Sequence, residues 1–275
     1  MFHAGSFEGI SCSQRQPVQG QDGGHVCLDH PFMSEMSVSD KYARIVQEMG
    51  LHPNRKRLSY YLQHCVFHDI DLQGKSMIDI GSGRGIYSFY AGFTGAKRAL
   101  CIEPELEGSN QTAMSQFKRL SEEFGLPQIE LKRVTFQDFD PEDEKFDVIL
   151  LHHSINHLDE EACMQLKTSE AARKRYRAIF GKLADISNEG SKLVMADCSR
   201  YNFFALLKIR NPFAPTIEWQ KHQSPYLWCG LLRDFGFTNS RIRWTAPGGL
   251  YRLFVGNLVA SYFLISHFVL TLTKL

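Results

Sequence analysis

Short apolar runs alternate with amphipathic stretches along most of the chain. Five of the apolar runs fall at residues 76–80, 97–102, 129–134, 146–151 and 191–196, and segments with helical periodicity separate them. Strands that alternate with helices in this way predict a parallel sheet with helices on both faces. Two later runs, 241–244 and 268–273, alternate apolar and polar side chains with a period of two, which is typical of half-buried strands. The pattern therefore predicts an α/β fold around a seven-stranded sheet.

The helical segments are delimited by capping residues. Ser37 is suited to cap a helix that reaches Met49, and a second helix is predicted at 54–67. We expect one helix over 159–186, between the fourth and fifth strands, and another over 225–235. Residues 1–35 are rich in Gly, Ser and Gln and have no apolar periodicity, so they predict a flexible tail.

A glycine-rich motif follows the first predicted strand and carries the main functional signal. The sequence there is Met77-Ile-Asp-Ile-Gly-Ser-Gly-Arg-Gly85, with glycines at three alternate positions and Asp79 before the first. Such glycines let the backbone turn tightly and approach a ligand closely. A helix then begins, and its free N–H groups can receive a polar ligand. Glu103 ends the next apolar run, where it can accept hydrogen bonds from a ribose. This arrangement predicts a nucleoside-binding βαβ unit.

The glycine spacing indicates which nucleoside the loop is expected to bind. A dinucleotide fingerprint needs a glycine where this chain has Ile86, so a nicotinamide enzyme is disfavoured. The G-x-G-x-G pattern with its two acids resembles motif I of the class I S-adenosylmethionine-dependent methyltransferases. The resemblance implies S-adenosylmethionine as cofactor. It also implies that Asp79 orders the loop and the methionine end of the cofactor, and that Glu103 holds its ribose.

Later motifs extend this resemblance over about residues 55–245. In that family an acid after the third strand takes the adenine amino group, which here is Asp138, and an apolar residue flanks the ring. The fourth strand and the histidine at His157 match a further motif. The resemblance implies an antiparallel last strand, a helical lid at 36–70 and a methyltransferase domain at 71–275. The cofactor-binding residues that it implies are Asp79, Gly81, Ser82, Gly83, Arg84, Gly85, Glu103, Pro104, Gln137, Asp138, Phe139 and His152.

Candidate catalytic residues follow the carboxyl ends of the fourth and fifth strands, where ligands bind in such sheets. A hydroxyl acceptor benefits from a general base, and histidine is suited to that task near neutral pH. His153 is the favoured base, His157 is a second candidate, and Asp197 is placed to orient a base or bind a substrate hydroxyl. A zinc site is disfavoured because Ser154 stands where H-E-x-x-H needs glutamate. A magnesium site is disfavoured because His152 stands where catechol-type methyltransferases carry an acid, so no metal is predicted.

Two segments exceed what a minimal methyltransferase needs, at about 200–224 and 246–264. The first combines aromatic side chains with hydrogen-bonding groups, which suits a polyhydroxylated ring. It also resembles the corresponding segment of bacterial methyltransferases of glycoconjugate synthesis. We therefore expect O-methylation of a sugar or another small hydroxylated metabolite. N- or C-methylation of a small molecule and a non-catalytic, cofactor-binding scaffold remain as alternatives. The candidate substrate-binding residues are Arg200, Asn202, Trp219 and His222.

Charge, cysteine content and apolar length set the remaining expectations. A net charge of +1 gives no reason to expect a nucleic-acid partner. Seven cysteines without a C-x-x-C pair, and no signal-peptide pattern, predict free thiols in the cytoplasm. Residues 253–273 carry no formal charge, but the period-two alternation of 268–273 favours a strand over a membrane span. Weak peripheral contact with a membrane or a lipid-linked sugar stays open, as does the oligomeric state.

Overall fold

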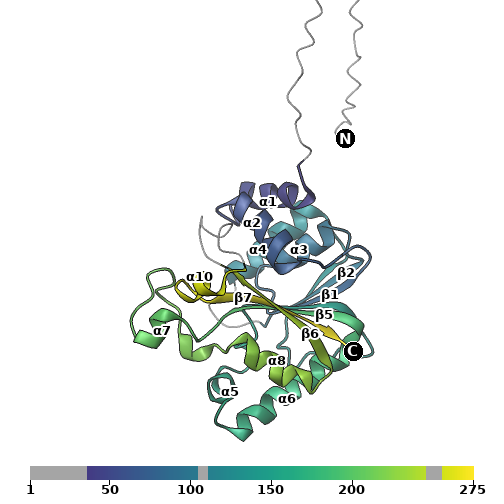
Figure 1. The fold of residues 1–275 in the computed structure, drawn as a ribbon. Coiled ribbons are helices and arrows are strands. Elements are labelled where there is room, and N and C mark those ends of the chain that lie inside the picture. The colour runs from purple at the N-terminus through teal and green to yellow at the C-terminus, as the bar shows by residue number, and fades with distance from the viewer. Residues whose placement is uncertain (1–35, 105–110, 246–255) are drawn as a thin grey trace, which may run out of the picture. The chain divides into compact units, whose positions relative to one another are not determined.

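The computed structural model describes residues 36–104, 111–245 and 256–275, which contain a seven-stranded sheet (Figure 1). The strands are β1 (Ser76–Ile80), β2 (Arg98–Ile102), β3 (Ile129–Lys132), β4 (Phe146–His152), β5 (Ser187–Cys198), β6 (Phe237–Thr245) and β7 (His267–Lys274). Their order is β3-β2-β1-β4-β5-β7-β6. β1 to β5 pair in parallel, whereas β7 pairs antiparallel with both β5 and β6. The predicted sheet, mostly parallel with an antiparallel last strand, is confirmed.

Helices cover both faces of this sheet, as predicted (Figure 1). One face carries α1 (Val38–Glu48), α2 (Arg55–Tyr61), the π-helix η1 (Leu62–Val66), α3 (Ile86–Phe93) and α4 (Gln111–Phe124). The other face carries α5 (Glu160–Gln165), α6 (Glu170–Asp185) and α8 (Pro225–Arg233). The remaining short helices α7 (Phe203–Leu207), η2 (Trp219–Lys221) and α10 (Leu258–Tyr262) lie in connections near the end of the sheet at which β7 begins.

The alternation of side chains along the strands produces two apolar cores. On the face of α6 and α8, Leu193, Met195 and Leu270 join Phe180 and Trp228 in one buried cluster. On the opposite face, side chains at the alternate strand positions join the residues of α1, η1 and α3 in a second cluster. The near-continuous apolar runs of β1 and β4 follow from this, because both faces of a central parallel strand are buried.

One element differs from its sequence prediction. The prediction of a single helix over 159–186 is wrong, since the structure has α5 and α6 with a turn between them. Ser169 begins the second helix, because its hydroxyl accepts a hydrogen bond from the Ala172 amide at 3.2 Å. A serine in this position satisfies a backbone donor that would otherwise be free at the helix start, and so favours a new helix there.

The segment at 36–70, predicted as a lid, packs against the glycine-rich loop and the helix that follows it. Ser37 caps α1 as predicted. The hydroxyl of Tyr42 donates to the Ile86 carbonyl at 2.5 Å, and the Arg84 guanidinium donates to the Leu51 carbonyl at 2.9 Å. These bonds connect the first helices directly to the start of α3.

Two of the predicted regions fall outside the described residues: the N-terminal tail at 1–35, and positions 246–255 of the second insertion. Within the parts of the chain that the structure describes, no helix combines the length and the apolar character needed to cross a membrane. The period-two run at 268–273 forms the interior strand β7, as its alternation predicted.

Candidate functional site

The glycine-rich loop lies at the carboxyl edge of the sheet, directly after β1. Gly81 has a φ of +74°, and a Cβ there would lie 2.5 Å from the Cβ of Ser154. Gly83 has a φ of +54°, and no described residue has an atom within 4 Å of the position where its Cβ would be. Packing therefore requires glycine at the first position. At the second, the backbone borders open space, where a ligand can approach closely.

Asp79 lies fully buried on β1, just before the loop. Its Oδ2 accepts a hydrogen bond from the Ser88 hydroxyl at 2.8 Å, whereas its Oδ1 has no partner among the described residues. Burial raises the pKa of this carboxyl to about 7, although the bond from Ser88 acts in the opposite direction. Asp79 thus has one oxygen bonded to Ser88 of α3 and one without a partner among the described residues.

Glu103 follows β2 and reaches the same loop. Its Oε2 accepts a hydrogen bond from the backbone N–H of Gly83 at 2.8 Å. The carboxylate therefore lies at the loop position that borders open space.

The three residues predicted around an adenine ring lie elsewhere in the structure. Asp138 accepts a hydrogen bond from the Thr135 hydroxyl at 2.6 Å, and Gln137 donates to the Leu158 carbonyl. Phe139 is buried in the core cluster under α6. None of the three lines the cavity described next, so their roles toward a cofactor stay predictions.

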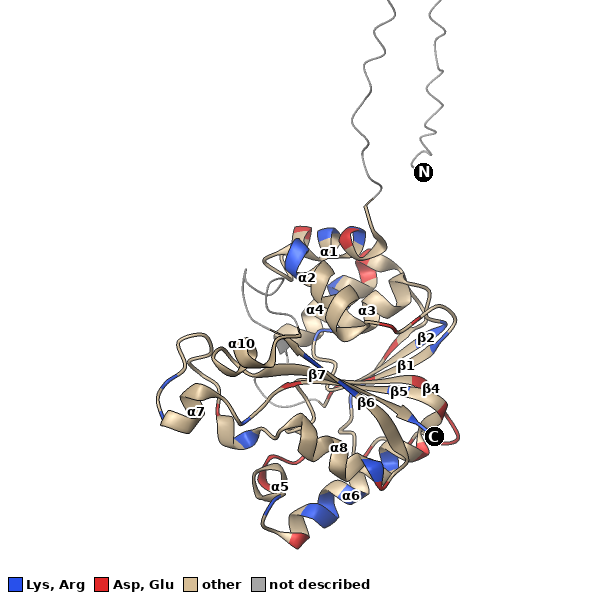
Figure 2. Ribbon diagram, in the orientation of Figure 1, with Lys and Arg blue, Asp and Glu red and all other residues tan. Residues whose placement is uncertain are grey.

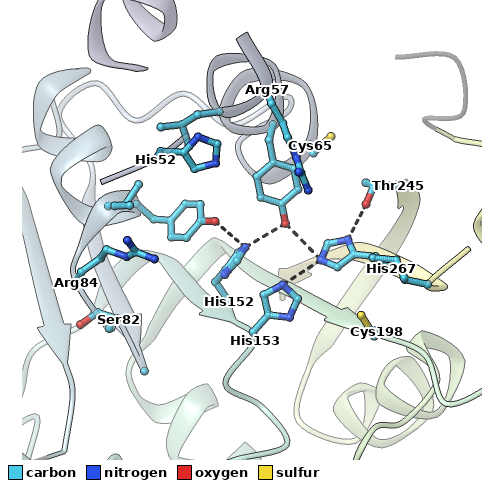
Figure 3. A pocket seen from close by; sticks show the side chains of 17 residues that line it. His52, Arg57, Cys65, Ser82, Arg84, His152, His153, Cys198, Thr245 and His267 are labelled. Carbon is cyan, nitrogen blue, oxygen red and sulfur yellow. Dashed lines mark hydrogen bonds between the residues drawn. The ribbon is translucent and has the colours of Figure 1, made fainter. Parts of the chain in front are cut away.

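A cavity of about 430 Å³ opens between the glycine loop and the helices α2 and η1 (Figure 3). Ligand-binding pockets in proteins have volumes of this order. Predicted residues in its lining are Gly81, Ser82, Gly83, Arg84, His152 and His153. The described lining contains two arginines and four histidines but no Asp or Glu.

His152 ends β4 with its ring between two tyrosines. Its Nε2 lies 3.0 Å from the Tyr61 hydroxyl and 2.8 Å from the Tyr87 hydroxyl. Burial lowers the pKa of His152 well below its usual value, and the neighbouring histidines act in the same direction. Burial also raises the pKa of both phenols, which therefore stay protonated, and either one can donate to the Nε2 of a neutral imidazole.

His153, the predicted base, follows in the next position with a φ of +54°. This left-handed conformation is uncommon for a side chain other than glycine, and such residues often occur at functional sites. The Nε2 of His153 lies 3.3 Å from the Nε2 of His267, and the His267 Nδ1 lies 2.6 Å from the Thr245 hydroxyl (Figure 3). Burial lowers the pKa of His267 to about 3, with a further contribution from His153. The cluster therefore presents an uncharged imidazole beside a half-exposed one.

Asp197 lies fully buried beneath this cluster, near the end of β5. Its Oδ1 lies 2.9 Å from the Nδ1 of His222 and 3.8 Å from the Nδ1 of His153. Burial alone would raise the pKa of Asp197, but the two imidazoles outweigh it and lower the pKa to about 2. The site thus holds a permanent carboxylate between two histidines. Such a carboxylate stabilises a neighbouring imidazolium when a proton arrives.

The other predicted residues lie apart from the cavity lining. His157 is more than half exposed, and its Nδ1 lies 2.6 Å from the Oε1 of Glu160. Asn202 caps α7 through a hydrogen bond from Ala205, and Arg200 contacts Gln223 at 3.5 Å. Trp219 packs beside His222, with ring centroids 6.4 Å apart. Of the predicted substrate-binding residues, only His222 thus contacts a predicted catalytic residue.

The structure adds cavity-lining residues that the sequence analysis did not select. His267, Thr245 and the two tyrosines complete the histidine cluster, and Arg57 of α2 lines the same cavity (Figure 3). A signal for His267 existed in the predicted topology. An antiparallel last strand begins at the carboxyl edge, so its first residue lies beside the end of the fifth strand. The observed pairing of His267 with Cys198 has this geometry.

A metal site does not emerge from the described part of the chain. No group of three or more histidine, cysteine, aspartate or glutamate side chains there is arranged to hold an ion. The five described cysteines are all free thiols, and Cys101 and Cys198 are buried.

Comparisons with known proteins relate this architecture to one class of enzyme fold. No protein-family model matches the chain, and no curated protein matches it by sequence. Among solved structures, it is similar to an S-adenosylmethionine-dependent methyltransferase from Aquifex aeolicus, with 13% identity, a TM-score of 0.50 and coverage of 85% of this chain and 98% of that one. A Listeria monocytogenes protein, provisionally described as such a methyltransferase, gives 15% identity, a TM-score of 0.51 and coverage of 74% and 93%. The fold is therefore that of the S-adenosylmethionine-dependent methyltransferases.

Proposed function

We propose that the protein is an S-adenosylmethionine-dependent methyltransferase that methylates a hydroxyl group of a small molecule, with sugars among the candidate acceptors. One observation carries the proposal. The cavity has at one end a glycine loop whose Gly83 amide bonds the Glu103 carboxylate, and at the other end a histidine cluster in which His153 lies 3.8 Å from the buried Asp197. The first end suits a nucleoside cofactor and the second suits removal of a proton from a hydroxyl.

The residues of the loop fit the proposed cofactor. A Cβ at Gly83 would occupy the open space beside the loop, and the buried Asp79 before the loop keeps one oxygen without a partner among the described residues. Glu103 would exchange its bond to the Gly83 amide for bonds to ribose hydroxyls, and the freed amide would become a donor to the ligand. When bound, S-adenosylmethionine supplies an electrophilic methyl group on its sulfonium sulfur.

The histidine cluster would prepare the acceptor. Methyl transfer is an in-line displacement, so the protein contributes mainly by orienting the reactants and taking up the proton. His153 is half exposed in the cavity and lies 3.8 Å from Asp197, so it can accept a proton from a hydroxyl and be stabilised as the cation. His267 does not compete for this proton, because burial lowers its pKa to about 3.

The choice of a hydroxyl acceptor depends on this base. An amine that is already deprotonated needs little help, and the described lining carries no Asp or Glu to attract a cationic amine. The 200–224 segment supports a sugar-like acceptor less directly, because its exposed Tyr201 and Phe213 offer apolar faces and its His222 reaches Asp197.

Binding and transfer should be tested separately. S-adenosylhomocysteine should raise the melting temperature of the full-length protein, and NAD should not. Incubation with a methyl donor carrying an isotope label, together with a fractionated small-molecule extract, should yield a labelled product whose methyl NMR shift identifies its attachment to oxygen. Attachment to nitrogen or carbon would support the alternative transferases. Binding without transfer from any fraction would support the scaffold reading.

A further inference from the structure

A second cavity lies on the same face of the sheet, beyond the histidine cluster. It measures about 910 Å³ and is bounded by β5, β6, β7 and the segment after η1. The first cavity and the second share one lining residue, Cys65 of η1. They are therefore adjacent spaces along one surface.

The strand register shows how the two cavities connect. Thr245 and His267 are paired in the first cavity, and the next pair on the same face is Arg243 with Val269. The pair after that consists of Arg241 on β6 and Thr271 on β7. On the other side of β7, Thr273 pairs with Lys192 of β5. Since a strand advances about 3.3 Å per residue, Arg243 lies roughly 7 Å along the sheet from the histidine cluster.

The side chains on this part of the face are cationic and hydroxylated. Lys192, Arg241 and Arg243 line the cavity together with Thr271 and Thr273, and Figure 2 shows basic positions along β6. A sheet face that packs against helices is apolar, as the other half of this face is. Polar and basic residues at the corresponding positions therefore form a surface suited to solvent or to a polar, negatively charged ligand.

The cationic character is only partly neutralised by the described lining. Its one described carboxylate, Asp69, is shared by His68 at 2.7 Å and Arg241 at 3.4 Å, which leaves Lys192 and Arg243 without a carboxylate partner in that lining. The Lys192 ammonium donates to the Thr273 hydroxyl at 2.8 Å. The guanidinium of Arg243 has no hydrogen-bonding or ion-pairing partner in the described part of the chain, and the residue is only partly exposed. It is thus a cation next to the first cavity whose donors have no partner among the described residues.

We propose that this cationic groove, lined by Arg243, Arg241 and Lys192, binds the anionic end of the methyl acceptor. The inference rests on the proposed function, because it places the hydroxyl at His153 and an oxyanion group, such as a phosphate, on Arg243. Arginine presents several donors in a planar fork that matches phosphate and carboxylate oxygens. The acceptor would therefore be a small hydroxylated molecule with its negative group on the order of 10 Å from the methylated oxygen.

The groove can be tested without the acceptor, with inorganic pyrophosphate as the probe. Calorimetric titration of the full-length protein at low ionic strength should show binding that weakens as salt is added. Arg243→Gln should weaken this binding about tenfold, as loss of a charge-assisted contact does, while Arg243→Lys should retain part of it. The matched control is Arg177→Gln, which removes a half-exposed arginine on α6 whose partner is Asp234. Equal affinity in Arg243→Gln and the control would overturn the inference and assign the binding to general surface charge.

A second measurement connects the groove to the acceptor. The extract fractions that accept a labelled methyl group should be those retained by an anion-exchange resin. With such a fraction, Arg243→Gln should raise KM about tenfold and leave kcat within about twofold, because the contact is made equally in the ground and transition states. Acceptor activity in the unretained fraction would overturn the inference. Failure of the proposed function has a different signature, since S-adenosylhomocysteine would then not bind and pyrophosphate binding would be unaffected.

Discussion

The two ends of the main cavity differ in the titratable groups that surround them. At the glycine loop, the Glu103 carboxylate accepts a hydrogen bond from the Gly83 N–H, and burial raises the pKa of Asp79 to about 7. At the other end burial keeps His152, His267 and two phenols uncharged, and the described carboxylate there, Asp197, lies beneath the cluster. A carboxylate bonded to the loop backbone suits the binding of a ligand with constant hydrogen-bonding groups. A histidine above a buried anion suits a step in which a proton moves.

This contrast predicts the largest effect for a change at the histidine end. Replacing His153 with alanine should reduce kcat about 10²- to 10⁴-fold, because the hydroxyl proton would have no positioned acceptor. Turnover of a labelled methyl group measures this loss. The affinity for S-adenosylhomocysteine, measured by calorimetry, should stay within about twofold and serves as the control. An unchanged rate would contradict the base assignment and favour an acceptor that needs none.

A change at the glycine end should have the reverse signature. Glu103→Ala removes the carboxylate at Gly83, so S-adenosylhomocysteine should bind about 10- to 100-fold more weakly, as loss of hydrogen bonds to a charged group does. Calorimetric titration measures the change. The control is Glu122→Ala, which removes an exposed carboxylate of α4 whose partner is Lys118. A large loss of kcat at saturating cofactor in Glu103→Ala would contradict the division between the two ends.

The two ends also differ in how far the sequence reveals them. The glycine end is local in sequence: the loop and both acids fall within residues 79–103, so one motif predicts it. The histidine end combines residues that are far apart in the chain. His267 meets His153 only because β7 inserts beside β5, and their separation of 114 positions leaves no local pattern.

The same reasoning explains the fold predictions. The strands could be predicted because buried central strands are continuously apolar and β7 alternates with a period of two. The break between α5 and α6 could not be predicted, because the helical pattern continues across it and only the Ser169 cap marks the start of the second helix. The contact between His222 and Asp197 depends on the path of an irregular segment, which residue patterns do not specify.

Acidification should lower the stability of the folded protein through the histidine end of the cavity. The pKa of His267 is about 3 in the folded protein against an ordinary value of 6.5. Between these pH values the unfolded chain binds a proton at His267 and the folded protein does not. This contribution to stability is complete above about pH 6.5 and is lost as the pH falls toward 3. Between pH 7 and pH 5 the melting temperature of His267→Gln should fall by about 4 °C less than that of the wild type. Calorimetric scans at both pH values measure the difference, and equal falls would contradict a neutral His267.

The smallest effect is expected at His157, the third histidine of the run that follows β4. Its side chain is 58% exposed and its Nδ1 pairs with Glu160, whereas His152 and His153 line the cavity. An exposed pair of this kind contributes about 0–1 kcal/mol, so His157→Ala should leave the melting temperature almost unchanged. Its kcat should stay within about twofold of the wild type in the assay where His153→Ala loses 10² or more. A loss at His157 as large as that at His153 would move the proton acceptor out of the cavity and contradict the contrast between its two ends.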